Sequence, residues 1–169
     1  EIDGLIVKLI NSKNEVNASE IGGLAPEIKI LPGEIKTGEA LIKTTSKKIN
    51  VAVGENTLSV EPRAKEVLIN DTDVTVTAES ASIKNGALNV GNAEVKLAPV
   101  AIAQKLNITP KTMELKAENN RAVYKITTDE NRKLFGLFPV IVQKTVSVDG
   151  STGDMLGESR SWWSFLSVK

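Results

Sequence analysis

Apolar and polar residues alternate through much of the first hundred positions of the chain. The alternation is clearest in three runs, Ile49/Val51/Val53, Val74/Val76/Ala78 and Leu88/Val90. A period of two predicts β-strands that bury one face and leave the other in water. Strand centres recur roughly every eight residues between positions 50 and 97, close to the spacing typical of sandwiches and barrels. We therefore expect a mainly β protein.

Turn-forming residues separate these runs. Asn85-Gly86 is the strongest signal, because it lies between Ile83 and Leu88 and suits a type I′ hairpin, in which both central residues have positive φ. Asn70-Asp71 is a further turn signal. The pattern favours an antiparallel β-sandwich-like region. A β-solenoid is the alternative, although the residue types show no strict repeat.

The pattern changes near residue 98. A charged stretch at 129–133 lies within this second region and is not assigned to a strand. The predicted elements are a helix at 98–106 with Pro99 in its first turn, strands at 113–117 and 122–126 joined by a turn at Asn119-Asn120, a long strand from about Phe138 to Val148, a turn at 149–153 and a short strand from Met155.

The aromatic residues divide the chain in the same way. All six lie late in the sequence, at Tyr124, Phe135, Phe138, Trp162, Trp163 and Phe165. The first part must therefore build its core from aliphatic side chains alone. We expect a β-rich, aromatic-free domain at 1–97 and an α+β module with an aromatic C-terminal tail at 98–169.

Composition excludes several classes of function. The chain has 21 basic and 21 acidic residues and a formal net charge of zero, whereas nucleic-acid binding needs a net basic footprint. It has no Cys and no His, which removes disulfides, the usual zinc sites and histidine general bases. No run reaches the ~18 apolar residues of a membrane span. We expect no cofactor, no metal, no nucleic-acid partner and no transmembrane segment in this chain.

The segment from Val148 to Leu156, VDGSTGDML, resembles the end of the PepSY-type domain, and the order of the elements before it is similar as well. That family closes with a Val-Asp-Ala-x-Thr-Gly-Glu-Val-like strand, turn and strand, and this chain has Gly150 for Ala and Asp154 for Glu. The runs KLFGLFPV at 133–140 and WWSFL at 162–166 are similar to a module that recurs in secreted or membrane-attached archaeal proteins. The resemblance covers about residues 98–169. It implies a small, non-catalytic α+β module, which in some proteins accompanies a peptidase.

Two apolar segments are candidate interaction sites. One is an expected strand near the N-terminus, which either joins the protein's own sheet or is donated to the sheet edge of a neighbouring subunit. Donation repeated head to tail would produce a filament. The other is the aromatic tail, for which packing within the protein is favoured over sugar binding. The candidate residues are Leu5, Ile6, Val7, Leu9 and Ile10 in the first segment and Trp162, Trp163 and Phe165 in the second.

Other motifs are less specific. Asp149, Ser151 and Gly153 match the first half of a calcium loop, but an EF-hand needs a carboxylate at its twelfth position, which here is Arg160, so a simple turn is favoured. Three sequons are candidate glycosylation sites at predicted loops or termini, beginning at Asn17, Asn70 and Asn107. Scattered carboxylates are interpreted as solvated charge, for example Glu15, Glu20, Glu34 and Glu39.

These observations favour a non-enzymatic extracellular or cell-surface structural protein. Its expected partner is a protein, either a further copy of the chain or another envelope component, and strand exchange is the expected means of self-assembly. The first alternative is a PepSY-like binding or regulatory module that acts on a peptidase or envelope partner. The second is a carboxylate-dependent hydrolase, which would need two carboxylates converging in a cleft.

Overall fold

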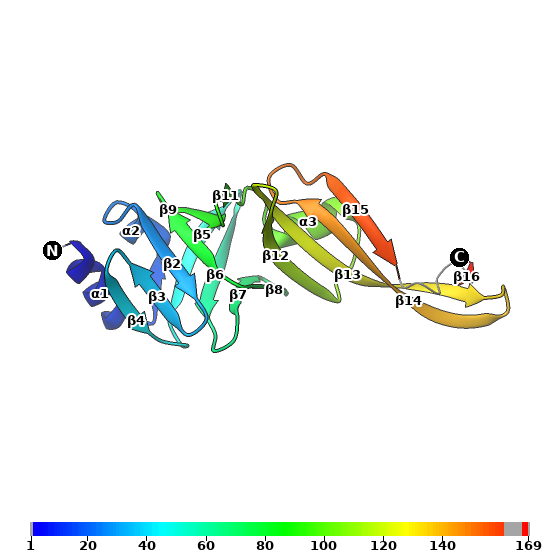
Figure 1. Ribbon diagram of the computed structural model, residues 1–169, viewed down its shortest axis with the longest axis horizontal. Helices are drawn as coiled ribbons and strands as arrows, with labels where there is room; N and C mark the ends of the chain where they lie inside the picture. The colour runs from blue at the N-terminus through cyan, green and yellow to red at the C-terminus, as the bar shows by residue number, and fades with distance from the viewer. Residues whose placement is uncertain (1, 161–166, 169) are drawn as a thin grey trace.

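The computed structural model of the protein describes residues 2–160 and 167–168. Ten strands form one mixed sheet and six form a second, antiparallel sheet (Figure 1). The mainly β fold is therefore confirmed. The solenoid alternative is wrong, because in the described residues the strands lie side by side in two open sheets. Within the same residues, no helix has both the length and the apolar character needed to cross a membrane.

Five strands of the larger sheet come from the first half of the chain. Four of them form an antiparallel meander joined by tight turns, and β1 pairs with β5 in the parallel direction. The alternating apolar residues that the sequence placed on one face, such as Ile49, Val51 and Val76, are buried. The strands are β1 (Glu15–Asn17), β5 (Lys48–Val53), β6 (Asn56–Pro62), β7 (Val67–Asp71) and β8 (Val74–Ala78).

The smaller sheet packs against the larger one, with β10 against β5 and β2 against β6. The buried layer between them contains Ile28, Ile30 and Leu88. Asn85 and Gly86 have φ of 51° and 79°, so the predicted hairpin between β9 and β10 is confirmed. In sheet order the strands are β11 (Ala93–Glu94), β10 (Ala87–Val90), β9 (Ala81–Lys84), β2 (Glu27–Leu31), β3 (Glu34–Thr37) and β4 (Ala40–Lys43).

The N-terminal segment corrects a prediction. Residues 5–10 were expected to form a strand, but they lie in helix α1 (Ile2–Ser12), which is followed by the short helix α2 (Ala18–Ile21). A short apolar run fits either a strand or a buried helix, and here the helical period decides. Ile6 and Ile10, four residues apart, are 0% and 1% exposed, whereas Leu5 is 57% exposed. We call α1, α2 and β1–β11 the body.

The second half of the chain continues the larger sheet. Helix α3 begins at Pro99, one residue later than predicted, and is followed by Asn107, which caps it in the left-handed conformation with φ of 51°. Asn119 and Asn120 form the expected turn, both with positive φ. The elements are α3 (Pro99–Leu106), β12 (Thr112–Glu118), β13 (Arg121–Leu134), β14 (Phe138–Asp149), β15 (Met155–Arg160) and β16 (Ser167–Val168).

Strand β13 is longer than the sequence indicated, because the charged stretch at 129–133 belongs to it. These residues pair with β14 in one unbroken register that ends at Leu134↔Phe138. Pairing satisfies main-chain groups whatever the side chains are, and in a two-stranded ribbon charged side chains can reach water from either face. Charge therefore did not mark the end of the strand.

The body and the second half share one sheet. β8 and β12 pair in parallel at Thr77↔Glu114 and Ala78↔Leu115. Beside this junction, the buried Asp71 carboxylate accepts hydrogen bonds from the Val100 N–H at 3.0 Å and from Asn56 Nδ2 at 3.1 and 3.2 Å. Asp71 thereby satisfies an N–H at the start of α3, where the helix dipole also favours a negative charge.

Tyr124 makes a second polar contact at the junction. Its hydroxyl donates to the Leu97 carbonyl at 2.8 Å, and its ring is fully buried in the core. Burial, and then the nearby Asp71 charge, raise the pKa of Tyr124 far above its usual value. The hydroxyl therefore stays protonated and remains a hydrogen-bond donor.

Candidate interaction surface

The most prominent feature of the outer surface is a projecting two-stranded ribbon. β13 and β14 continue past the point where their neighbours stop, since β12 ends its pairing at Thr112↔Thr127 and β15 at Lys144↔Arg160. We call residues 128–144 the arm. Figure 1 shows it extending away from the body at the opposite end of the molecule from α1.

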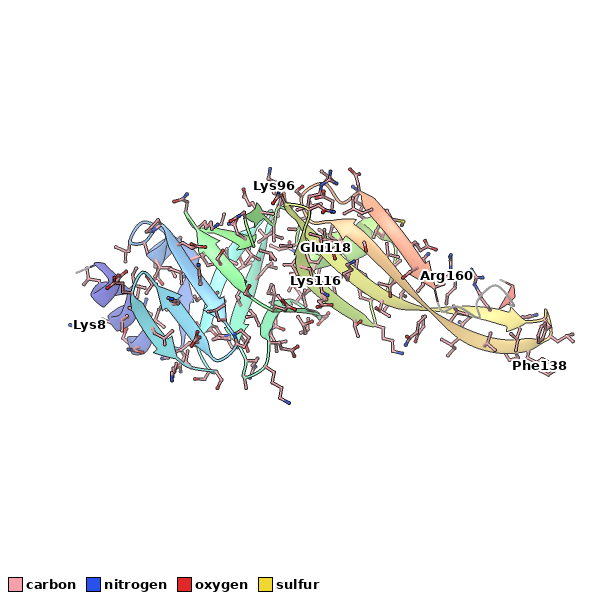
Figure 2. The ribbon with its side chains drawn as sticks, viewed as in Figure 1. Lys8, Lys96, Lys116, Glu118, Phe138 and Arg160 are labelled. Atoms are coloured by element: carbon pink, nitrogen blue, oxygen red, sulfur yellow. The ribbon has the colours of Figure 1, made fainter. Side chains whose placement is uncertain are left out.

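The end of the arm exposes large apolar side chains. Phe135, Leu137, Phe138 and Ile141 are 66%, 75%, 61% and 60% exposed. Four partly exposed side chains of this size present roughly 400–500 Å² of apolar surface, which is comparable to the interaction patches of soluble proteins. We call these four residues the tip. Figure 2 shows Phe138 at the far end of the ribbon and Lys8 of α1 at the opposite end of the molecule.

The turn of the arm holds an aromatic residue in an unfavourable conformation. Phe135 and Gly136 have φ of 50° and 75°, and the Leu137 N–H donates to the Leu134 carbonyl at 3.0 Å. Glycine adopts positive φ freely, whereas a bulky residue there is a conformational outlier. The left-handed conformation costs about 1–2 kcal/mol for an L-residue. The turn therefore carries an exposed phenyl ring where Asn or Gly would be better tolerated.

Both edges of the ribbon are modified near the tip. β16 pairs with β13 at Lys133↔Val168 and Leu134↔Ser167, so the edge of β13 is covered there. On β14, the Gly150 N–H bonds to the Ala122 carbonyl at 2.7 Å. Main-chain groups alternate in direction along a strand, so even-numbered residues of β14 face β13 and Pro139 faces the open edge. Because proline has no N–H, it removes a donor from that edge.

The apolar part of β14 lies across from charged residues of β13. No residue from 134 to 143 is ionisable, but Lys133 and Lys144 adjoin this run, and Lys133 and Arg132 pair with Pro139 and Val140. At the base, Glu130 Oε2 lies 3.2 Å from Nε of both Arg132 and Arg160. Arg160 also pairs with Glu158, which lies 3.2 Å from Lys144. Figure 2 places Arg160 where the ribbon leaves the rest of the sheet.

The two faces of the arm differ in exposure. Val142 is fully buried, and the Glu130 and Arg132 side chains are only 16% and 14% exposed. Asn131 and Ile141, which point to the opposite face, are exposed. Phe138 points to the same face as Val142, whereas Ile141 shares the other face with Pro139, Lys133 and Asn131.

The residues that the sequence suggested as interaction sites are not the residues of the tip. Ile6 and Ile10 are core residues and Val7 and Leu9 are partly buried against the core, so Leu5 is the one member of that segment with a largely exposed side chain. Trp162, Trp163 and Phe165 lie outside the described residues. Sequence reasoning did not propose the tip as a site. The sequence feature that could have revealed the tip is the uncharged run at 134–143, which contains Phe135-Gly136.

The loop at Asp149 is a turn whose carboxylate is satisfied internally. Asp149 Oδ1 accepts from the Ser151 hydroxyl at 2.7 Å, the Ser151 N–H at 2.8 Å and the Thr152 N–H at 3.3 Å. The bond from the Ser151 hydroxyl is the largest of the effects that lower the pKa of Asp149. The simple turn is the arrangement observed. Among the described residues, no three Asp or Glu side chains are grouped to hold a metal ion.

The three sequon asparagines differ in their surroundings. Asn17 and Asn107 are exposed at the ends of helices. Asn70 was expected at a turn but lies within β7, and the turn falls at Thr72, which has φ of 52°. The Asn70 amide donates to Glu61 at 3.4 Å and accepts from Thr75 at 3.0 Å. A glycan on Asn70 would attach at Nδ2, the atom that donates to Glu61.

A groove of about 600 Å³ opens at the junction of the body and α3, lined by polar residues that include Glu55, Thr72 and Gln104. Its most buried carboxylate, Asp71, is already bonded to Asn56 and to the start of α3. That carboxylate therefore has a structural role.

No protein-family model, curated protein or solved structure matches this chain.

Proposed function

We propose that this protein is a non-enzymatic extracellular or cell-surface structural protein that attaches to a partner surface through the tip of its arm. The observation that supports the proposal is the group of four exposed apolar side chains at the end of a ribbon that projects from the molecule. Exposing an apolar patch of this size to water costs free energy, and contact with a partner would remove that cost.

Strand exchange through residues 5–10 is not part of this proposal. Ile6 and Ile10 are already buried in the core as part of α1. Donating the segment to a neighbour would require the helix to unfold and both isoleucines to leave the core. Self-association remains one way in which the tip finds a partner, with contact through side chains instead of a donated strand.

The PepSY-like regulatory module remains a prediction for residues 98–169. The described residues of this half have the order α3, β12, β13, β14 and β15, with a turn bounded by Asp149 and Gly153. The arm would serve such a module equally well as a contact surface for an envelope partner. The tip is therefore the place to test under either function.

The proposal is tested by sedimentation of the full chain, alone and with envelope fragments of the organism that makes it. We expect the protein to self-associate or to sediment with the fragments. The double substitution Leu137→Ser and Phe138→Ser should abolish either behaviour, because it removes two of the four exposed apolar side chains of the tip. The matched control is Met155→Ser, since Met155 is 52% exposed but lies on β15, outside the arm.

Two results would contradict the proposal. One is a monomer at all concentrations that never sediments with envelope fragments. The other is equal behaviour of the tip double variant and Met155→Ser. Each variant changes exposed residues only, so circular dichroism and thermal unfolding should match the unsubstituted protein and show that lost attachment does not reflect lost folding.

A further inference from the structure

We propose that Asn17 carries an N-linked glycan whose first sugar residue lies in a polar hollow beside it. The polar side chains that line the hollow are Asn17, Ser19, Asn50, Thr57 and Asn85. This site is separate from the tip and goes beyond the proposed function, with which it shares only the requirement for export. Its support is the acceptor motif, the amide of Asn17 and the chemistry of the hollow.

Asn17 is placed to accept a glycan. It begins the sequon Asn17-Ala18-Ser19 and is exposed at the end of β1, which is an edge strand among the described residues. The main-chain N–H of Asn17 donates to Glu20 Oε2 at 3.1 Å. Within residues 2–160 and 167–168, no hydrogen bond uses Asn17 Nδ2, the atom that a sugar would join. Attachment at this atom therefore breaks no internal hydrogen bond.

The other two sequons differ from Asn17 in different ways. Asn70 is half-buried on β7, where its Nδ2 donates to Glu61 at 3.4 Å and its Oδ1 accepts from Thr75 at 3.0 Å. Attachment there would replace the bond to Glu61. Asn107 is exposed like Asn17, but it lies between α3 and β12 and does not line the hollow. Asn107 is therefore a matched sequon without the hollow.

The hollow has room for a sugar residue and adjoins Asn17. Its volume is about 520 Å³, within the range of roughly 300–1,000 Å³ found for small-molecule sites. Asn17 and Asn50 are paired across β1 and β5, so their side chains point to the same face of the sheet. Thr57 on β6 pairs with Ala52, two residues after Asn50, and extends this face. A sugar on Asn17 Nδ2 would therefore lie beside Asn50.

The side chains that line the hollow suit a sugar. Their polar groups are amides and hydroxyls, and none of the lining residues is ionisable. Amides and hydroxyls both donate and accept hydrogen bonds, as the hydroxyl groups of a sugar require. Asn56 and Asn70 are bonded to carboxylates, whereas the Asn50 and Asn85 side chains form no hydrogen bond with the described part of the chain. Asn50 and Asn85 can therefore bond to a sugar without breaking an internal contact.

An attached sugar fits the hollow better than a free one. The lining residues include no aromatic ring on which a free sugar could stack. Amides and hydroxyls that exchange bonds to water for bonds to a sugar gain little net free energy. A sugar joined to Asn17 is held beside the hollow at a high effective concentration, so that weak contacts are sufficient to keep it there.

The attachment is a substitution at the anomeric carbon of a lipid-linked sugar phosphate. Asn17 Nδ2 forms a bond to this carbon and loses one proton, which a base of the transferase accepts. The bond between the carbon and the phosphate oxygen breaks, and the phosphate leaves with the electron pair. The exporting cell supplies the donor and the transferase, and this chain supplies the acceptor amide and the Ser19 hydroxyl of the sequon.

Mass spectrometry of the protein purified from the organism that makes it tests the attachment. Trypsin places the three sequons on separate peptides, 14–29, 66–84 and 106–111. We expect a sugar on peptide 14–29 and none on peptide 66–84. Peptide 14–29 without a sugar would overturn the inference. A sugar on peptide 66–84 would overturn it as well, because an unbonded amide would then not decide where attachment occurs.

Thermal unfolding tests the place of the sugar. The glycosylated chain should melt about 2–4 °C above the same chain made in cells without a transferase, the effect of a few hydrogen bonds at this chain length. Asn50→Ala with Thr57→Ala should remove most of this gain while peptide 14–29 stays glycosylated. Asn107→Gln is the control and should leave the gain unchanged. An equal gain in the double variant, or its loss in Asn107→Gln, would show that the sugar does not lie in the hollow.

The two proposals fail separately. Leu137→Ser with Phe138→Ser changes the tip and leaves the sequon at Asn17 intact. If peptide 14–29 has no sugar while attachment to envelope fragments depends on the tip, the glycan inference fails and the proposed function stands. If the sugar is present and attachment does not depend on the tip, the proposed function fails and the glycan inference stands.

Discussion

Side chains of the same kind are buried in the body and exposed in the arm. In the body, isoleucines such as Ile28, Ile30 and Ile69 lie in the core and are at most 1% exposed. In the arm, Ile141 is 60% exposed on a ribbon that no second layer of the described residues covers on that side. Both segments alternate by the period of two. The difference comes from whether a second sheet packs on the apolar face.

This comparison separates folding from attachment. A side chain that contacts many neighbours contributes its burial to stability, whereas one that projects into water contributes little until a partner covers it. The body should therefore set the stability of the protein and the tip its binding. The following predictions test that division, from the largest expected effect to the smallest.

Substitution of the same residue type in the two regions should give very different stabilities. Ile69→Ala should lower the free energy of unfolding by about 3–4 kcal/mol, because it leaves a cavity in the core. Ile141→Ala should change it by less than about 0.5 kcal/mol. Urea denaturation of the two variants measures both values. Similar losses would show that the arm is part of the cooperative core.

The junction should be sensitive to its buried carboxylate. Asp71→Ala leaves the Val100 N–H and the Asn56 amide without their acceptor, so we expect a loss of about 2 kcal/mol. The matched control is Asp73→Ala, because Asp73 is exposed in the adjoining turn and should matter little. Thermal unfolding of both variants provides the measurement. Equal melting temperatures would mean that Asp71 does not hold α3 to the body.

The Asp149 turn should make stability depend on pH in the acid range. The pKa of Asp149 is lowered in the folded protein, so its contribution is complete above its unfolded pKa of about 3.9 and is lost as pH falls through the folded value. Asp149→Asn should cost about 1 kcal/mol at pH 6, because a neutral acceptor replaces a charged one. The gap between the two proteins should begin to narrow near pH 4 and continue to narrow as pH falls further.

The control for this prediction is Asp154→Asn, since Asp154 is exposed and the Ser151 hydroxyl donates to Asp149. Its stability should follow that of the unsubstituted protein from pH 6 to pH 3. A gap between Asp149→Asn and the unsubstituted protein that stays constant over this range would show that the carboxylate charge has no part in holding the turn.

The smallest effect should be a gain in stability at the turn of the arm. Phe135→Asn places a residue that tolerates positive φ at a position with φ of 50°, which should stabilise the turn by up to about 1 kcal/mol. Amide hydrogen exchange at Leu137 should slow, while attachment through the tip weakens because an aromatic ring is lost. Faster exchange at Leu137 would show that Phe135 supports the turn through its side chain.

Sequence alone predicted those elements whose signals are local. The Asn85-Gly86 hairpin, the helix that begins at Pro99 and the turn at Asn119-Asn120 depend on residues with strong backbone preferences, and the structure contains all three. Residues 5–10 were predicted wrongly, because a short apolar run has no unique period. The length of β13 was also missed, because charge along a ribbon does not prevent pairing.

The amino-acid sequence by itself determined that this protein is mainly β, that it has no Cys or His chemistry and that an uncharged run surrounds Phe135-Gly136. Only the tertiary structure decided which apolar residues are buried. Period and composition describe one segment at a time, whereas burial depends on what packs across from it. Ile69 is packed in the core, and within residues 2–160 and 167–168 no second sheet covers Ile141, so the same alternation forms a core in the body and an exposed apolar surface in the arm.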